Sequence, residues 1–252
     1  MRYENALESI LPKMKNVNGV VAIFLKGSIA RGENDAYSDL DLYVMLKHDV
    51  MVETVYGDIV KALEAYRKLL YKDLIEIICP QIIGVYTDML HIDCYIVYEN
   101  DYPQTDVIKV LYDPGHRLNH YKEQDLRLTT EMFNDSAIDS CWFIYQYDHI
   151  AERGQHLWTT QMIDNALNHV TKVLLYKYYP EKSLLGKKAA HHLPSEIYET
   201  LVKVNDLNNS RSHRETVSVF MNLYKNEIKS IVEMEWDQGF EDIFNYLYEK
   251  YA

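Results

Sequence analysis

The 252-residue sequence contains few cysteines, no long apolar run and fewer basic than acidic side chains. Its three cysteines, Cys79, Cys94 and Cys141, are odd in number and far apart, with neither CxxC spacing nor clustered histidine partners. This pattern favours buried, reduced thiols over metal ligands. We expect the three thiols to be reduced and buried.

Long hydrophobic segments are also missing. No stretch reaches the roughly 18–20 apolar residues that a membrane-spanning helix needs. The first residues, MRYENALESILPKMK, lack the basic flank followed by an apolar run that is typical of a secretory signal. We therefore expect a cytoplasmic protein without a membrane partner.

Positive charge is the third feature that is scarce. The chain has 26 Lys plus Arg against 38 Asp plus Glu, a formal net charge of −12, divided equally between residues 1–112 and 113–252. Neither part therefore offers a basic groove that would neutralise many phosphates, and we expect no nucleic-acid partner. An enzyme that uses nucleotides with metal ions, or a protein that attracts cationic small molecules, remains compatible with this charge.

The periodicity of apolar residues divides the chain into two parts. The first part alternates helices and strands, and the second has only helical periods. The expected helices and strands of the first part are helix 3–16, strand 20–25, strand 39–46, helix 54–70, strand 74–79 and strand 89–98. The expected helices of the second part are 136–152, 157–179, 194–207, 212–234 and 239–251. We predict an α/β domain over residues 1–112 and an all-helical domain over residues 113–252.

The stretch GSIARG at residues 27–32 follows a continuous apolar run that predicts a buried strand. A strand that ends in Gly27 and Ser28 lets the backbone approach a ligand closely and expose its N–H groups. Ser28 adds a hydroxyl group, and Arg31 lies near enough to reach the same ligand. Anionic oxygens, such as those of a phosphate, are the ligands that this turn favours.

Six residues later the stretch SDLDL carries two carboxylates. Asp39 and Asp41 are two apart on an expected strand, so both side chains project from one face. Two carboxylates this close repel each other unless one is protonated or a divalent cation binds. Mg²⁺ takes oxygen ligands and usually keeps phosphates and waters in its remaining positions.

A third carboxylate, Asp93, lies in the apolar strand 89–98. If that strand is beside the strand of Asp39 and Asp41, Asp93 completes a triad that binds metal and takes the proton of an attacking hydroxyl. A lone DxD or Gly-Ser turn is most often surface decoration. Their occurrence together, in order and on strands, instead favours two-metal nucleotidyl transfer.

Four further groups of residues have a functional and an ordinary interpretation. Lys187, in the loop Gly186-Lys187-Lys188, either binds phosphate or is simply exposed. His191 and His192, with His213 or His169, do not have the spacing of a zinc site. Asp148, His149, Glu152 and Arg153 share one helix and either line a cleft or form a solvated face. Trp142 and Trp158 are expected in the core rather than as stacking platforms.

The combined pattern resembles the signature of the nucleotidyltransferase superfamily typified by DNA polymerase β. The stretch GSIARGENDAYSDLDLYV is most similar to minimal bacterial nucleotidyltransferases and to the antibiotic nucleotidyltransferases that act on aminoglycosides or lincosamides. The motif resemblance covers residues 20–98. It implies an α+β fold for the N-terminal catalytic domain, with a mixed sheet of about five strands, followed by an all-α substrate-binding domain.

The resemblance also implies roles for individual residues. Gly27 and Ser28 match the turn that holds the triphosphate, and Arg31 matches a position that often assists the phosphates. Asp39 and Asp41 match metal ligands, and Asp93 matches the third ligand and general base. These matches imply transfer of a nucleoside monophosphate with two Mg²⁺ ions and a nucleoside triphosphate, ATP being favoured. Lys187 lies outside the matched motifs and is a nucleotide-binding candidate only from its basic loop.

The acceptor and the assembly stay open at this point. The acidic balance favours a cationic or neutral small molecule, such as an aminoglycoside-like or lincosamide-like antibiotic, that receives AMP on a hydroxyl and releases pyrophosphate. The alternative is a protein adenylyltransferase of the minimal, antitoxin type, although the long helical part counts against it. A non-enzymatic relic is disfavoured because the acidic residues of the motif are intact. The chain is expected to act as a monomer or a homodimer.

Overall fold

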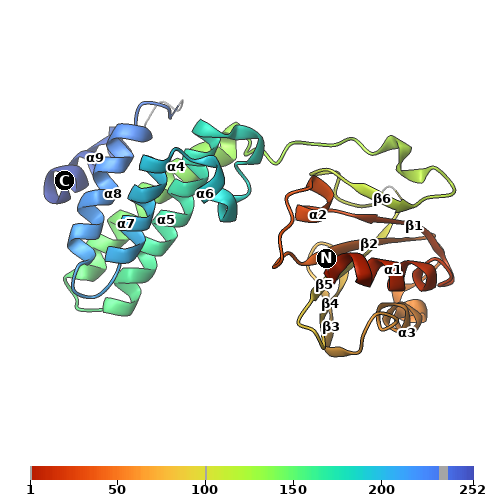
Figure 1. Cartoon of the computed structure of the whole chain (residues 1–252). Helices are drawn as coiled ribbons and strands as arrows, with labels where there is room; N and C mark the ends of the chain where they lie inside the picture. Colours follow the sequence, from red (N-terminus) through yellow and green to blue (C-terminus); the bar gives the residue numbers. More distant parts are fainter. Residues whose placement is uncertain (1, 100, 233–237) are drawn as a thin grey trace. The chain divides into compact units, whose positions relative to one another are not determined.

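The computed structural model describes residues 2–99, 101–232 and 238–252. The chain folds as two compact units, Met1–Gln124 and Asp125–Ala252, which are described separately (Figure 1). The first unit extends beyond residue 112, where the sequence suggested a boundary. The physical reason is that Leu118 is buried against Phe24 and its neighbours in the core of the first unit.

The first unit is built on a mixed sheet with strand order β3-β4-β5-β2-β1-β6. Strands β2 and β5 are parallel, and the other neighbouring pairs are antiparallel. This confirms the expected fold class, with six strands in place of about five. The elements are α1 (Arg2–Met14), β1 (Val20–Leu25), α2 (Gly27–Arg31), β2 (Leu40–Leu46), α3 (Val52–Leu63), β3 (Leu69–Glu76), β4 (Pro80–Tyr86), β5 (His91–Tyr98), β6 (Lys109–Tyr112) and the 3₁₀ helix Arg117–His120.

Several expected boundaries are wrong. The predicted helix 54–70 ends at Leu63, and Leu69 already pairs with Tyr86 in the β3–β4 hairpin. β3 is an edge strand of the sheet, and most of its side chains are exposed, so it lacks the apolar alternation of a strand with one buried face. Strand β4 and the short β6 were not predicted, and the turn after β1 contains the helix α2.

Helices α1 and α3 cover one face of the sheet (Figure 1). Ile10 of α1 and Ile59 of α3 are fully buried in one cluster with Leu40, Leu42 and Ile92 of the central strands. Successive side chains of a strand point to opposite faces of its sheet. The residues that alternate with these leucines and isoleucines therefore lie on the opposite face, where the polar side chains of β2 and β5 gather.

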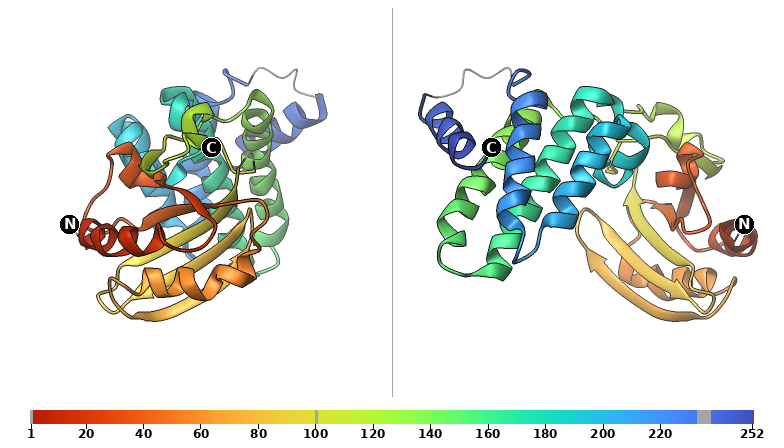
Figure 2. Two further views of the ribbon diagram at one scale, coloured as in Figure 1. Left: turned by 90° about the vertical axis from the view of Figure 1, so that its right-hand side faces the viewer. Right: turned by 60° about the vertical axis from the view of Figure 1, so that its left-hand side comes forward.

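In the described residues of the second unit every regular element is a helix, and the unit has its own core. The long helices α4 and α5 lie side by side in both views of Figure 2. Its elements are α4 (Thr130–Ala151), α5 (His156–Tyr178), the 3₁₀ helices Pro180–Lys182 and Gly186–Lys188, α6 (Ala189–His192), α7 (Ser195–Leu207), α8 (His213–Glu227) and α9 (Gln238–Tyr251). The predicted helix 212–234 ends at Glu227, and its last two residues lie outside the described part of the chain. Among the described helices, none has the length and apolar character needed to span a bilayer.

Candidate active site

The parallel pairing of β2 with β5 brings the predicted carboxylates together. Asp41 is the direct register partner of Asp93, and two residues along, Tyr43 is the partner of Tyr95. The two tyrosine rings stack with centroids 4.4 Å apart. Asp39 lies immediately before β2, and one of its carboxylate oxygens is within 4.8 Å of a carboxylate oxygen of Asp93. The three acids therefore gather on the sheet face that α1 and α3 do not cover.

The turn after β1 lies directly against one of these acids. Gly27 has a φ of +68°, and a Cβ atom at this position would stand 2.0 Å from Oδ2 of Asp41. Only glycine combines this backbone conformation with room for the carboxylate. Ser28 follows as the second residue of α2 and is half-buried. The structure thus brings the predicted phosphate-binding turn and the predicted metal ligands to one place.

Lys26 is a buried cation that the sequence pattern does not predict as a site residue, because it directly continues an apolar strand. The side chain of Lys26 is buried, and its Nζ donates a hydrogen bond to the carbonyl oxygen of Pro103 at 2.7 Å. The same Nζ lies over the rings of Tyr43 and Tyr121. Burial lowers the pKa of Lys26, and the negative charge of Asp106 opposes that shift. The hydrogen bond of Lys26 therefore connects the end of β1 to the segment after β5 that contains Pro103.

Arg31 has two carboxylate partners of its own. Its Nε lies 2.9 Å from Oε2 of Glu33, and its Nη1 donates to Asp106. The Arg31 side chain is only 8% exposed. The guanidinium that was expected to assist phosphates thus ties α2 to the same segment that Lys26 holds.

Two further polar residues surround Asp93. Gln81, a buried residue of β4, donates from Nε2 to Oδ1 of Asp93 at 2.8 Å. His91 Nε2 lies 3.5 Å from the same oxygen. His91 is two residues before Asp93 on β5, so this spacing could have indicated its position on the same face. Gln81 carried no such signal, because its strand was not predicted.

The donor atoms fit a divalent cation. Asp39, His91 and Asp93 each offer a ligand atom, and these atoms lie within 4.8 Å of one another. Among residues 2–99, 101–232 and 238–252, no other set of three or more Asp, Glu, His or Cys side chains has ligand atoms this close together. Carboxylate oxygens suit Mg²⁺, and Asp41 adds another carboxylate on the neighbouring strand.

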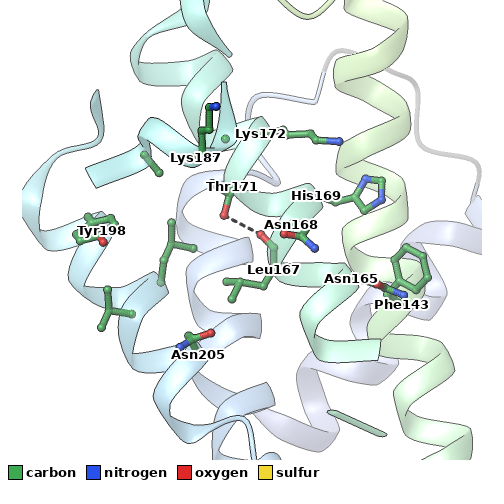
Figure 3. A pocket seen from close by; sticks show the side chains of 14 residues that line it. Phe143, Asn165, Leu167, Asn168, His169, Thr171, Lys172, Lys187, Tyr198 and Asn205 are labelled. Carbon is green, nitrogen blue, oxygen red and sulfur yellow. Dashed lines mark hydrogen bonds between the residues drawn. The ribbon is translucent and has the colours of Figure 1, made fainter. Parts of the chain in front are cut away.

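Lys187 belongs to the second unit. It lies in the 3₁₀ helix Gly186–Lys188 and lines a hollow of about 830 Å³ together with Lys172 of α5 (Figure 3). His169, Asn165 and Asn168 also line this hollow, and the lining set contains no acidic residue. Two lysines without an acid make the hollow favourable for an anionic group.

A second hollow of about 510 Å³ brings together part of the polar face predicted on α4. Asp148, His149 and Glu152 line it with Asp242 and Tyr246 of α9, among others. Asp148 is buried and accepts hydrogen bonds from α9, so this face is not simply solvated.

The remaining candidates behave as follows. The ring of His192 stacks on Tyr179 at 4.2 Å, and neither it nor His191 joins a metal-binding group in the described part of the chain. The expectation that Trp142 and Trp158 are core residues is wrong, because their side chains are 39% and 55% exposed. The amphipathic spacing of α4 and α5 is satisfied by other residues. Cys94 and Cys141 are buried as expected, and Cys79 is partly buried.

Comparison with known proteins finds a family match within the first unit. Residues 7–83 match the model of the nucleotidyltransferase domain. No curated protein matches the sequence. Among solved structures, an aminoglycoside 6-adenyltransferase from Bacillus subtilis is 14% identical with a TM-score of 0.41, and the match covers 99% of this chain and 98% of that chain. The spectinomycin adenyltransferase AAD(9) from Enterococcus faecialis, solved with ATP and spectinomycin, is 11% identical with a TM-score of 0.37 and 98% coverage of both chains.

Proposed function

We propose that this chain, which is a nucleotidyltransferase with its nucleotidyltransferase domain at residues 7–83, transfers AMP from ATP to a hydroxyl group of a small molecule. One observation carries the proposal. Asp41 and Asp93 are register partners on parallel strands, Asp39 lies beside them, and the turn at Gly27 is packed against the carboxylate of Asp41. The turn that is proposed to bind the phosphates of the nucleotide therefore lies next to the carboxylates that are proposed to bind metal ions.

In the proposed reaction the acceptor oxygen forms a bond to the α-phosphorus of ATP, and the bond between that phosphorus and the pyrophosphate oxygen breaks. Asp93 accepts the hydroxyl proton. Gln81 holds the carboxylate of Asp93 in a fixed orientation through Oδ1, which keeps the base in place. Asp39, Asp41 and Asp93 would hold two magnesium ions, which supply positive charge that stabilises the phosphate oxygens in the transition state.

Each unit contains one place that we propose for phosphate groups. Ser28 and the backbone of the turn at Gly27 bind the triphosphate of ATP. Lys187, next to Lys172 in the lysine-lined hollow, is a second place for phosphate oxygens. Arg31 stabilises the helix α2 that follows this turn, through its ion pairs with Glu33 and Asp106.

For the acceptor we propose an amine-bearing or neutral small molecule, such as an aminoglycoside-like or lincosamide-like antibiotic, bound by the helical unit. The hollow on α4 and α9 supports this choice, because its lining contains the carboxylates of Glu152 and Asp242 in addition to the Asp148–Lys250 ion pair. Carboxylates beside the rings of Tyr145 and Tyr246 suit a cationic, hydroxyl-rich ligand. The formal net charge of −12 also attracts cations to the protein.

The test is to incubate the purified chain with MgATP labelled at the α-phosphate and a panel of aminoglycosides, aminocyclitols and lincosamides. We expect label on at least one compound and release of pyrophosphate. Asp39→Asn and Asp41→Asn should each reduce the turnover by orders of magnitude, while circular dichroism shows the fold retained. Full activity in both variants would overturn the roles given to these carboxylates. Label on a co-purifying protein, with none on the panel, would favour the protein adenylyltransferase alternative.

A further inference from the structure

We propose that His91 is a direct ligand of the divalent cation at this site, and that the site therefore prefers a transition-metal ion such as Mn²⁺ over Mg²⁺. The inference rests on the metal site of the proposed function and adds a nitrogen ligand to it. It assigns a specificity-determining role to a residue that lies outside the carboxylate pattern of the sequence.

The first support is position. His91 opens β5, two residues before Asp93, so both side chains project from the same face of the sheet. A ligand atom of His91 lies within 4.8 Å of ligand atoms of both Asp39 and Asp93. The site is also accessible, because the His91 side chain is 43% exposed and that of Asp93 is 13% exposed.

The second support is that the imidazole of His91 accepts and donates no hydrogen bond among the described residues. Its Nε2 lies 3.5 Å from Oδ1 of Asp93, which is longer than an ordinary hydrogen bond. That oxygen instead accepts the amide of Gln81 at 2.8 Å. Within the described residues, no hydrogen bond to the ring of His91 is formed. A neutral imidazole can therefore offer a lone pair to a cation that Asp39 and Asp93 also bind.

The third support is ligand chemistry. Mg²⁺ is a hard ion that takes oxygen ligands and dehydrates reluctantly. Imidazole nitrogen is a better ligand for first-row transition metals, whose affinities rise from Mn²⁺ through Co²⁺ and Ni²⁺. A site with two carboxylates and one imidazole therefore binds these ions more tightly than a purely carboxylate site does. His91 shifts the choice of metal without changing the carboxylates that hold the ion.

The experiment uses the full-length chain without a histidine tag and Mn²⁺ as the probe. Pulsed electron paramagnetic resonance of the bound ion should show coupling to a directly bonded ¹⁴N nucleus, and ¹⁵N-labelled histidine should replace that signal by one from ¹⁵N. His91→Gln should abolish the coupling and weaken Mn²⁺ binding about tenfold or more, with a smaller change for Mg²⁺ in competition. The matched control His120→Gln, at an exposed position of the same unit, should change neither.

The outcomes separate this inference from the proposed function. One outcome is that Asp39→Asn abolishes Mn²⁺ binding but the unsubstituted chain shows no nitrogen coupling. This outcome overturns the role of His91 and leaves the carboxylate site intact. Absence of Mn²⁺ binding, or binding that Asp39→Asn does not affect, overturns both. The labelling experiment uses the unsubstituted chain, so a misfolded His91→Gln variant does not decide the result.

Discussion

Among single residues, the site depends on a glycine that makes room for a carboxylate. A methyl group at Gly27 would stand 2.0 Å from Oδ2 of Asp41, so Gly27→Ala must displace that carboxylate. Because a displacement of about 1 Å in a catalytic group costs about 100-fold in rate, we expect turnover to fall by at least that factor. The measurement is the steady-state rate of AMP transfer at saturating ATP.

Gly32→Ala is the matched control for this prediction. Gly32 also has a positive φ, +70°, but a Cβ atom there would meet nothing within 4 Å. Both variants carry the strain of a left-handed backbone, about 1–2 kcal/mol of unfolding free energy. Only Gly27→Ala adds the clash with Asp41. Equal losses of activity in the two variants would show that strain, and not the position of Asp41, explains the effect.

The residues that the sequence made predictable are those whose chemistry has a fixed local spacing. Gly27 and Asp41 belong to short motifs on consecutive elements, and Asp93 is an acid in an otherwise apolar strand. Gln81 could not be found this way, because a glutamine in an unpredicted strand carries no local signal. Lys26 continues an apolar strand, and its burial depends on Pro103, which lies 77 residues away in the sequence.

At the scale of elements, α2 is held in place by a buried ion pair. The side chains of Arg31 and Asp106 are 8% and 12% exposed, so removing the guanidinium leaves a nearly buried carboxylate unpaired. Arg31→Gln should therefore lower the unfolding free energy by roughly 3 kcal/mol in urea denaturation. The double variant with Asp106→Asn should lose less than the sum of the single variants, because both charges are then absent.

The KM for ATP of Arg31→Gln distinguishes a role of Arg31 in holding α2 from a direct contact with the phosphates of ATP. If its role is to hold α2, the KM for ATP stays close to that of the unsubstituted chain at temperatures where the variant is folded. A raised KM with unchanged stability would instead give Arg31 the direct phosphate contact that its place in the motif suggested.

A second element contact joins α9 to α4. Asp148 of α4 accepts hydrogen bonds from Lys250 at 2.6 Å, from Tyr246 at 3.0 Å and from Tyr251. Burial alone would raise the pKa of Asp148, but these donors outweigh it and hold the pKa below its ordinary value of 3.8. A carboxyl group with a lowered folded-state pKa stabilises the fold above its ordinary pKa and loses this contribution as the pH falls through the folded value.

Asp148→Asn should therefore cost about 2 kcal/mol of unfolding free energy at neutral pH, because hydrogen bonds to a charged acceptor are lost. The difference from the unsubstituted chain should shrink as the pH falls below 3.8. Asp135→Asn, an exposed acid on the same helix, is the control and should change little. A cost that does not depend on pH would mean that the charge of Asp148 does not stabilise this contact.

The local sequence pattern predicted α4 and β3 only in part. The helical period of α4 could be read from the sequence, but the contact of Asp148 with Lys250 joins residues 102 apart and has no local signature. The edge strand β3 shows the opposite problem. Its exposed side chains resemble the end of a helix in pattern, and only pairing with β4 makes it a strand.

At the scale of the whole molecule, the two units have separate hydrophobic cores. Ile59 and Leu42 belong to one core, and Ile144 and Phe220 belong to the other. The ligand atoms of Asp39, His91 and Asp93 all lie in the first unit, whereas the lysine-lined hollow with Lys187 lies in the second. In the proposed function, the first unit binds the metal ions, and the second unit binds further phosphate groups or the acceptor.

We therefore expect residues 1–124, produced alone, to fold and to bind Mn²⁺ with the affinity of the full chain. The physical reason is that this unit contains its own core and every ligand atom of the metal site. AMP transfer should be absent from the fragment, because the helical unit that we propose to bind the acceptor is missing. Titration of Mn²⁺ and the transfer assay measure the two properties separately. Transfer by residues 1–124 alone at the rate of the full chain would place acceptor binding in the first unit.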